Sequence, residues 1–232
     1  MPIDLICLDA DDTLWHNMRH FNIAEEALHA MLEPFGDAAT ISHRLEECEV
    51  RNLAVYGYGA KGFTLSMIET AIELCGDAAT PQMISEILAA GRTLLTHPVE
   101  LFDDIEDTLE ALSARAPLVL VTKGDLLHQE VKLAASGLGE RFSGIEIVSE
   151  KDSQTFSRLF ARYGVDPVRA VMAGDSMRSD VLPALEAGAW AAFVPQEGGW
   201  GHERAQPPAG HTRYTQLARL ADLPAWIDGI GG

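Results

Sequence analysis

Short apolar segments alternate with amphipathic helical patterns at the start of the chain and again after residue 99, and this alternation is the strongest constraint on the fold. Apolar, partly β-branched segments predict strands at residues 3–8, 117–121, 145–148, 170–173 and 190–194. Helices are predicted at 103–115, 125–139, 153–164 and 179–188, and a Gly/Pro-rich loop at 195–211 precedes a short helix near 215–228. Short strands joined by helices are typical of a parallel sheet covered on both faces. We therefore predict an α/β fold with a doubly wound, Rossmann-like parallel sheet.

Residues 17–98 follow a different pattern, with four helical segments and no convincing strand. The simplest interpretation is an α-helical domain inserted after the first strand. Residues 17–98 would form this domain, and residues 1–16 together with 99–232 would form the α/β part. The insertion point lies directly after the first strand, so the insert begins close to the edge of the predicted sheet.

The helices of the insert carry two kinds of local signal. Thr80-Pro81 predicts the start of a helix that ends near His97, because Thr caps helices and Pro favours their first turn. Apolar residues also share one face on two helices, and such a face packs in a core or in an interface between chains. The oligomeric state therefore stays open. The two apolar faces are Ile23, Ala27, Met31 and Phe35, and Leu65, Ile68 and Ile72.

The composition favours a globular protein and argues against several kinds of partner. Of the 232 residues, 47% are hydrophobic, which is enough to form a core. The formal net charge of −18 argues against nucleic acid or an anionic membrane surface as a general partner. An anionic substrate must therefore be attracted by positive charge close to its binding site.

The cysteines and the apolar segments favour a cytoplasmic location. Cys7, Cys48 and Cys75 are scattered and lack the spacing of a zinc site, which suits a reducing compartment. The start MPIDLICL has no basic region of the kind that opens a signal peptide. No stretch approaches the roughly 18 continuous apolar residues of a membrane span. We expect a cytoplasmic protein.

Charged and polar residues follow the predicted strands where those strands end. The segment LICLDADDTLW, residues 5–15, places three acids within four positions and then Thr13. The carboxyl ends of parallel strands meet at one edge of a sheet, where ligands bind. We therefore expect acids, a hydroxyl group and lysines to converge there. The residues concerned are Asp9, Asp11, Thr122, Lys123, Lys151, Asp175 and Asp180.

This combination of residues suits phosphoryl transfer. Crowded carboxylates repel one another unless a cation lies among them, and Mg²⁺ prefers such oxygen ligands. A phosphate could then accept a hydrogen bond from Thr122 and a charge contact from Lys151. Asp9 is a plausible nucleophile, because carboxylates form aspartyl-phosphate intermediates. Asp11 could protonate the departing alkoxide and later activate water.

Four motifs resemble, in their order along the chain, the signature motifs of the haloacid dehalogenase-like (HAD) hydrolase superfamily. They are LICLDADDTLW, LVLVTKG, Lys151 and GDSMRSD, and each lies at the end of a predicted strand. The resemblance covers the whole sheet portion, and the helical insert looks like the cap domain of that superfamily. One such motif alone is a weak signal, whereas four in this order are highly specific.

The resemblance implies a role for each motif residue. Asp9 would be the nucleophile and Asp11 the general acid/base. The carboxylates of Asp9 and Asp175 and the backbone carbonyl of Asp11 would hold Mg²⁺. Thr122 and Lys151 would bind the transferring phosphoryl group.

Other positions of the motifs have an open role or depart from the usual pattern of the superfamily. Asp180 matches the second acid of the last motif and would either complete the metal shell or orient it. Asp12 stands where most members have Gly, and we interpret it as a turn residue outside the chemistry. Lys151 is followed by Asp152, where Pro is frequent. Lys132 is the other lysine between the second and fourth motifs, and its place in mid-helix makes it a poor rival to Lys151.

The stretch YGYGAKGF, residues 56–63, interrupts the helical pattern of the insert. One interpretation is a helix–helix turn packed by its aromatic residues. The other is a specificity loop that closes over the strand ends, with Tyr58 and Lys61 contacting the substrate. Lys123, next to Thr122, is a further candidate for substrate contact.

The sequence thus predicts a Mg²⁺-dependent phosphatase that acts on a small phosphorylated metabolite through an aspartyl-phosphate. A phosphosugar mutase keeps both acids and a similar cap, so that alternative stays open. Dehalogenases of the superfamily lack the acid two residues after the nucleophile, and Asp11 argues against them. Receiver-type signalling domains carry their phospho-accepting Asp after the third strand, where this chain leads to Lys151, which makes that alternative unfavourable.

Overall fold

A computed structural model describes residues 2–196 and 198–230 of the chain. It divides into two compact units. The α/β unit combines the N-terminal segment up to His16 with Val99–Lys123 and the chain from Gln129 onward, and the helical unit contains Asn17–Pro98. Gly124–His128, which the sequence assigned to the α/β part, groups with the helical unit. No helix in the described part of the chain combines the length and the apolar character needed to cross a bilayer.

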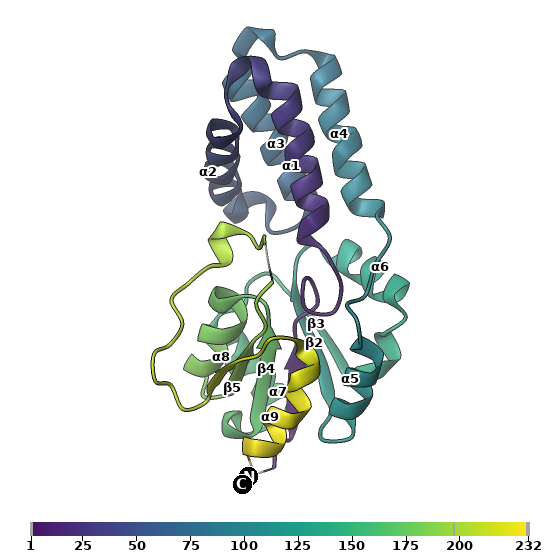
Figure 1. Cartoon of the computed structure of the whole chain (residues 1–232), viewed down its shortest axis with the longest axis vertical. Coiled ribbons are helices and arrows are strands. Elements are labelled where there is room, and N and C mark those ends of the chain that lie inside the picture. The colour runs from purple at the N-terminus through teal and green to yellow at the C-terminus, as the bar shows by residue number, and fades with distance from the viewer. Residues whose placement is uncertain (1, 197, 231–232) are drawn as a thin grey trace. The chain divides into compact units, whose positions relative to one another are not determined.

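The α/β unit is built on a parallel sheet of six strands in the order β3-β2-β1-β4-β5-β6 (Figure 1). Strand β1 lies in the middle and pairs with β2 on one side and β4 on the other. This is the doubly wound order, with the strand order reversing between β1 and β4, which confirms the predicted α/β fold. The strands are β1 (Leu5–Leu8), β2 (Leu118–Lys123), β3 (Gly144–Val148), β4 (Ala170–Gly174), β5 (Trp190–Phe193) and β6 (Tyr214–Gln216).

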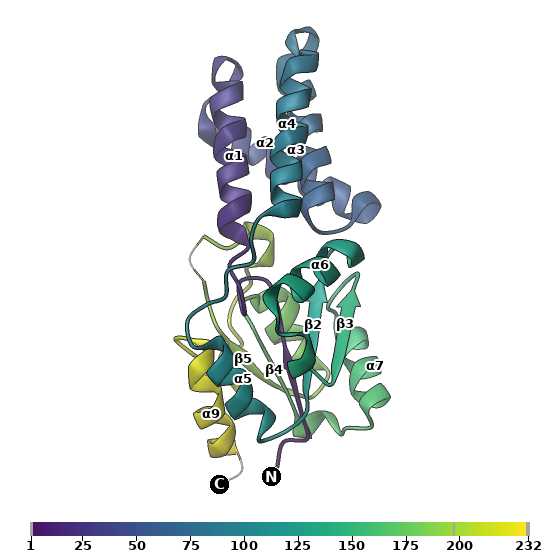
Figure 2. The same ribbon diagram turned by 90° about the vertical axis from the view of Figure 1, so that its right-hand side faces the viewer.

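Helices cover both faces of this sheet, because side chains of successive strand residues point to opposite faces. In β1, Ile6 and Leu8 pack in one core cluster, and Leu5 and Cys7 pack in the other. The first cluster contains residues of α5 (Ile105–Ser113), α6 (Leu126–Ser136) and α9 (Leu223–Ile230). The second contains residues of α7 (Ser153–Tyr163) and α8 (Leu182–Glu186), and Figure 2 shows α5 and α7 on different sides of the strands.

The C-terminal part of the α/β unit differs from the prediction. The sequence predicted a helix near 215–228, but β6 occupies Tyr214–Gln216 and α9 begins only at Leu223. A strand of three residues is too short to show an alternating pattern, and β6 is held by its backbone pairing with β5. The predicted helix at 179–188 begins instead as a π-helical turn, Met177–Val181, before α8.

The helical unit contains α1 (Met18–Leu32), α2 (Ala38–Tyr56), α3 (Ala60–Cys75) and α4 (Pro81–Thr96). The predicted start of the last helix is confirmed, since the Thr80 side chain accepts a hydrogen bond from the Met83 N–H. The YGYGAKGF stretch forms the turn between α2 and α3, where Gly57 and Gly59 have φ angles of 70° and 109°. Such positive φ angles favour glycine, so this stretch is a helix–helix turn.

The apolar faces predicted for two of these helices are not the faces that form the core. In α1, Ala24, Leu28 and Leu32 are buried, whereas Ile23 is 61% exposed. In α3 the core side includes Met67 and Ala71, with polar Ser66 and Thr70 also buried, and Ile72 is half exposed. The buried residues of α1 each follow a residue of the predicted face by one position. The buried face of α3 includes small and hydroxyl-bearing residues, which give little hydrophobic signal in the sequence.

Candidate active site

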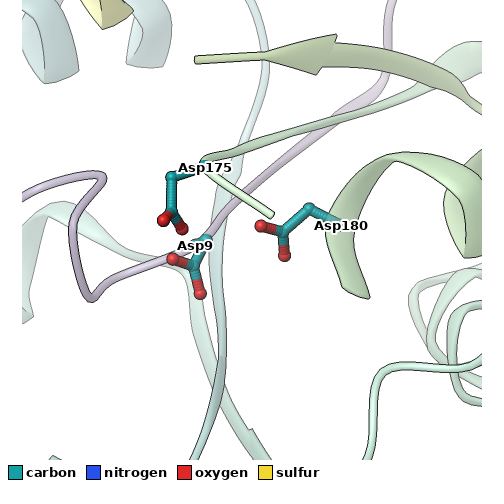
Figure 3. Close-up of side chains that lie close together, drawn as sticks. All are labelled: Asp9, Asp175 and Asp180. Atoms are coloured by element: carbon teal, nitrogen blue, oxygen red, sulfur yellow. The ribbon is translucent and has the colours of Figure 1, made fainter. Parts of the chain in front are cut away.

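Three carboxylates converge at the carboxyl ends of the two central strands (Figure 3). Asp9 follows β1, Asp175 follows β4, and Asp180 lies in the π-helical turn after β4. Each offers an oxygen that lies within 4.8 Å of an oxygen of the other two. The neighbouring strands β1 and β4 bring the first two together, and the Asp9 N–H donates to the Ala173 carbonyl at 3.0 Å. The sheet thus assembles an acidic cluster from distant motifs.

Lys151 provides positive charge inside this cluster. It precedes α7, is only 3% exposed, and its Nζ donates to the carboxylates of both Asp9 and Asp180. The distance from Nζ to Asp180 Oδ1 is 2.6 Å. Burial by itself lowers the pKa of Lys151, but the two carboxylates outweigh it and raise that pKa above its ordinary value. Lys151 is therefore held as a cation.

One lysine does not offset the charges of three carboxylates, of which Asp9 and Asp180 are buried and Asp175 is partly buried. Burial raises the pKa of Asp9 to about 7 in spite of Lys151, and repulsion from Asp180 adds to this effect. Burial, followed by the charges of Asp9 and Asp180, also raises the pKa of Asp175 well above its ordinary value. The cluster therefore has excess negative charge and an all-oxygen donor set. Among the described residues, Asp9, Asp175 and Asp180 are the group that could hold a metal ion, and this donor chemistry fits Mg²⁺.

Small residues and backbone groups hold the cluster in place. A Cβ atom at Gly174 would lie 2.2 Å from Asp180 Oδ2, so only glycine fits between these groups. Thr13 Oγ1 donates to Asp9 Oδ2 at 3.2 Å and accepts from the Asp175 N–H at 3.1 Å, linking the two strand ends. The neighbouring Asp12 has a φ angle of 58° and its N–H donates to the Trp15 carbonyl, as a turn residue does.

The Asp11 carboxylate has its own set of buried donors. It accepts from Trp15 Nε1 at 2.7 Å, from Gln129 Nε2 at 3.0 Å, and from Lys132 Nζ at 2.5 and 2.7 Å. Burial raises the pKa of Asp11, but Lys132 outweighs burial and the resulting pKa is lower than the ordinary value. Asp11 thus follows Asp9 closely in sequence, but its carboxylate is held by residues other than those that hold Asp9. The predicted metal contact through its backbone carbonyl stays a prediction.

Lys132, which the sequence made a poor rival to Lys151, lies in α6 and holds the carboxylate of Asp11. Its side chain is 4% exposed and contacts both oxygens of the Asp11 carboxylate. Gln129, one helical turn earlier, donates to Asp11 and also to Thr122 Oγ1 at 2.6 Å. Residues three apart lie on one face of a helix, so this spacing in α6 was a signal that the sequence offered. Lys151 contacts Asp9, and its binding of the phosphoryl group stays a prediction.

The side chains of Thr122 and Lys123, at the end of β2, have different partners. Thr122 is 2% exposed and lies against Gln129. Lys123 Nζ donates to Ser179 Oγ and to Glu203, each at 2.7 Å. Lys123 was predicted to contact substrate, and it is already paired with a carboxylate that the sequence did not mark. No motif or spacing indicated Glu203.

Tyr58 and Lys61 belong to the helical unit. Tyr58 is half-buried in the turn between α2 and α3. Lys61 lies in the first turn of α3 and forms an ion pair of 2.9 Å with Asp125 of the same unit. Its charge is thus shared with a carboxylate. The contact of Tyr58 and Lys61 with a substrate stays a prediction.

The segment that contains all four motifs matches a known protein family. Residues 3–188 match the family model described as haloacid dehalogenase-like hydrolase. The chain belongs to this family. A haloacid dehalogenase-like family hydrolase from Xanthomonas campestris, solved as a crystal structure, is 39% identical, with a TM-score of 0.88 over 98% of this chain and 91% of that one. The predicted superfamily and the prediction of a hydrolase are confirmed.

More distant relatives have different activities in their names. N-acylneuraminate-9-phosphatase of Homo sapiens is 23% identical over 167 residues, which cover 70% of this chain and 66% of the human protein. This chain therefore matches slightly less than two thirds of that relative. L-2-haloacid dehalogenase from Xanthobacter autotrophicus is 16% identical, with a TM-score of 0.66 over 98% of this chain and 99% of that one, and this likeness shows the fold alone. Proteins similar to this chain thus carry both phosphatase and dehalogenase names.

Proposed function

We propose that this hydrolase is a Mg²⁺-dependent phosphatase that removes phosphate from a small phosphomonoester. The observation that supports this proposal most is the cluster of Asp9, Asp175 and Asp180 around the buried Lys151, with Asp11 two residues after Asp9. Three carboxylates with one lysine suit a divalent cation and a phosphate dianion better than they suit an organic halide. The phosphatase activity named for the human relative agrees with this proposal.

Each residue would then act at a stated atom. An oxygen of the Asp9 carboxylate attacks phosphorus and forms an aspartyl-phosphate as the P–O bond to the ester oxygen breaks. Lys151 and Thr122 bind oxygens of the transferring phosphoryl group. Asp11 gives a proton to the leaving oxygen and later takes one from the water that hydrolyses the aspartyl-phosphate. Mg²⁺, held by Asp9, Asp175, Asp180 and the Asp11 carbonyl, would supply charge that favours binding and transfer of the anionic phosphoryl group.

The contacts of Asp11 bear on both proton transfers. Lys132 favours the carboxylate form of Asp11, which is the form that accepts a proton from water. Before the first step Asp11 has to take up a proton, and the negative charge of a bound phosphate favours that uptake. The acid two residues after the nucleophile also separates this proposal from a dehalogenase, in which no leaving alkoxide needs a proton.

The proposal is tested by phosphate release from a panel of phosphomonoesters, with Mg²⁺ and after its removal by EDTA. The panel contains p-nitrophenyl phosphate, sugar phosphates, nucleoside monophosphates, phosphoglycolate and N-acylneuraminate 9-phosphate, with 2-chloropropionate as the dehalogenase substrate. We expect release from at least one ester, lost with EDTA and restored by Mg²⁺. Halide release without a metal ion, or transfer of phosphate between sugar positions without release, would replace the phosphatase proposal by the corresponding alternative.

A second prediction concerns Lys132, a residue that positions Asp11. We expect Lys132→Met to lower kcat by about 10- to 100-fold on an alkyl phosphate, because the Asp11 carboxylate loses the cation that holds both of its oxygens. The loss should be smaller with p-nitrophenyl phosphate, whose leaving group departs without a proton. Glu130→Gln, an exposed change on the same helix, serves as the control and should keep the wild-type kcat. Equal losses on both substrates would place the effect in hydrolysis of the aspartyl-phosphate, a step that both substrates share, and wild-type kcat on both would contradict a role through Asp11.

A further inference from the structure

The loop after β5 is anchored to the α/β unit by Glu203. This residue ends the short 3₁₀ turn Gly201–Glu203 within the Gly/Pro-rich segment. Its carboxylate accepts from Lys123 Nζ at 2.7 Å and from the hydroxyl groups of Ser176 and Ser179, each at 2.5 Å. Arg178 adds a hydrogen bond from its guanidinium to the His202 carbonyl at 3.3 Å. The 3₁₀ turn is thus bound to the π-helical turn by side chains from both.

The contacts of Glu203 are charged and largely shielded from water. Its side chain is 20% exposed and that of Lys123 is 11% exposed. Burial raises the pKa of Glu203, but Lys123 and the two serine hydroxyl groups outweigh burial and lower it to about 2. Lys123 Nζ also donates to Ser179 Oγ, so all four polar side chains form one connected network. A network of this kind fixes the positions of its members more strongly than an exposed ion pair does.

This network connects the two strands on either side of the nucleophile strand. Lys123 follows Thr122 at the end of β2, and the two serines lie beyond the end of β4. Both β2 and β4 pair with β1, which carries Asp9. Ser176 is also tied to the acidic cluster, because its N–H donates to Asp180 Oδ2 at 2.9 Å. A change at Glu203 therefore reaches both the proposed phosphate-binding strand end and the turn that carries Asp180.

We propose that Glu203 is a positioning residue for anion binding: it holds Lys123 and the Ser176–Ser179 turn together and offsets the charge of Lys123 near a bound phosphate. The proposal rests on the phosphatase function and identifies a determinant outside residues 3–188, where the family match lies. Glu203 limits how tightly inorganic phosphate, the product of the reaction, is held. Positive charge that is not offset would strengthen the binding of phosphate.

Two substitutions separate the charge of Glu203 from its contacts. Glu203→Gln keeps the shape and the hydrogen-bond acceptor but removes the closer and less exposed of two carboxylate charges beside Lys123, since Glu150 lies at 3.6 Å and is 51% exposed. We expect its inhibition constant for inorganic phosphate to fall by about three- to tenfold, as an added unit charge several ångströms away allows. Glu203→Ala also removes the contacts to both serines, and we expect its kcat to fall by about 10- to 100-fold and by more than in Glu203→Gln. Calorimetric titration with inorganic phosphate in the presence of Mg²⁺ measures binding independently of turnover.

Glu146→Gln is the matched control, because Glu146 is another partly buried carboxylate of the α/β unit, paired with Arg162 and hydrogen-bonded by Tyr163. It should leave kcat, KM and phosphate binding unchanged. A purely structural role predicts that both Glu203 variants lose thermal stability and keep wild-type kcat, KM and phosphate affinity. That result would overturn the proposal.

A double-mutant cycle keeps this inference separate from the proposed function. Lys123→Met, Glu203→Gln and the double variant are compared by thermal unfolding, which needs no substrate. The midpoint should fall less in the double variant than the two single changes predict together, because each single change removes the closest charged partner of the other residue. Additive shifts of the unfolding midpoint would overturn the proposed pairing of Lys123 with Glu203. Non-additive shifts in a protein that releases phosphate from no ester would contradict only the proposed phosphatase activity.

Discussion

Asp9→Asn should abolish phosphate release, with a loss in kcat of at least about 10⁴-fold, as is typical when a covalent nucleophile is removed. The amide that replaces the carboxylate has no negative charge and is a poor nucleophile towards phosphorus. Lys151 would keep its contact with Asp180, so the variant should remain folded. Release is measured with the best ester of the panel at saturating Mg²⁺, and folding by circular dichroism.

Asp12→Asn is the matched control for this prediction, since it makes the same chemical change three positions later in the same buried turn. Asn tolerates the φ angle of 58° that Asp12 adopts. We expect Asp12→Asn to retain kcat within about threefold to fivefold, because Asp12 acts as a turn residue. Turnover at the native rate by Asp9→Asn would refute the aspartyl-phosphate intermediate. If both variants lost activity, the loss would be caused by the missing negative charge in this turn and would not show that Asp9 is the nucleophile.

Lys151→Met is expected to affect both catalysis and stability. The variant loses the charge that would bind the transferring phosphoryl group, and kcat should fall by about 10²- to 10³-fold. It also leaves the buried Asp9 and Asp180 without their cation, which costs about 3–5 kcal/mol when one partner of a buried pair is removed. For a chain of this size the midpoint of thermal unfolding should fall by roughly 6–20 °C in the absence of Mg²⁺.

The effect of Mg²⁺ tests whether Lys151 and the metal ion offset the same carboxylates. Addition of Mg²⁺ should raise the unfolding midpoint of Lys151→Met by more than that of the wild type, because binding to the folded state stabilises it. Arg162→Met is the control, as it removes a largely exposed cation from its ion pair with Glu146, and ion pairs with exposed members contribute about 0–1 kcal/mol. A stability loss in Lys151→Met that matches the control, with no extra effect of Mg²⁺, would show that the cluster does not depend on this lysine.

The parallel sheet and the acidic cluster could be predicted from the sequence because their signals are local. A short segment of sequence is enough to recognise an apolar strand followed by Asp9 or by Gly174-Asp175. Parallel strands then require those ends to meet at one edge, whatever the details of packing. The same locality explains why the start of α4 at Thr80-Pro81 was predicted correctly.

The predicted helix faces failed because burial depends on what each face packs against. Apolar periodicity placed Ile23 and Ile72 on the predicted faces, yet both are exposed. The buried faces contain Leu28 in α1, and Ala71 with buried hydroxyl groups in α3. Small side chains allow helices to approach closely and to form many packing contacts, and apolar periodicity in the sequence does not show those contacts. Strand β6 was not predicted for a related reason. Its backbone hydrogen bonds to β5 hold it in place, whereas its three residues are too few to form a recognisable strand pattern.

The sequence by itself determined the fold class, the order of the motifs and the acids that each strand delivers. Only the tertiary structure decided which residues hold those acids, because the partners come from distant segments. Lys132 and Gln129 reach Asp11 from α6, and Glu203 reaches Lys123 from a loop that lacks regular structure over most of its length. Charges separated by 80 or 121 positions meet only when the chain is folded, and their attraction depends on that distance and on shared burial.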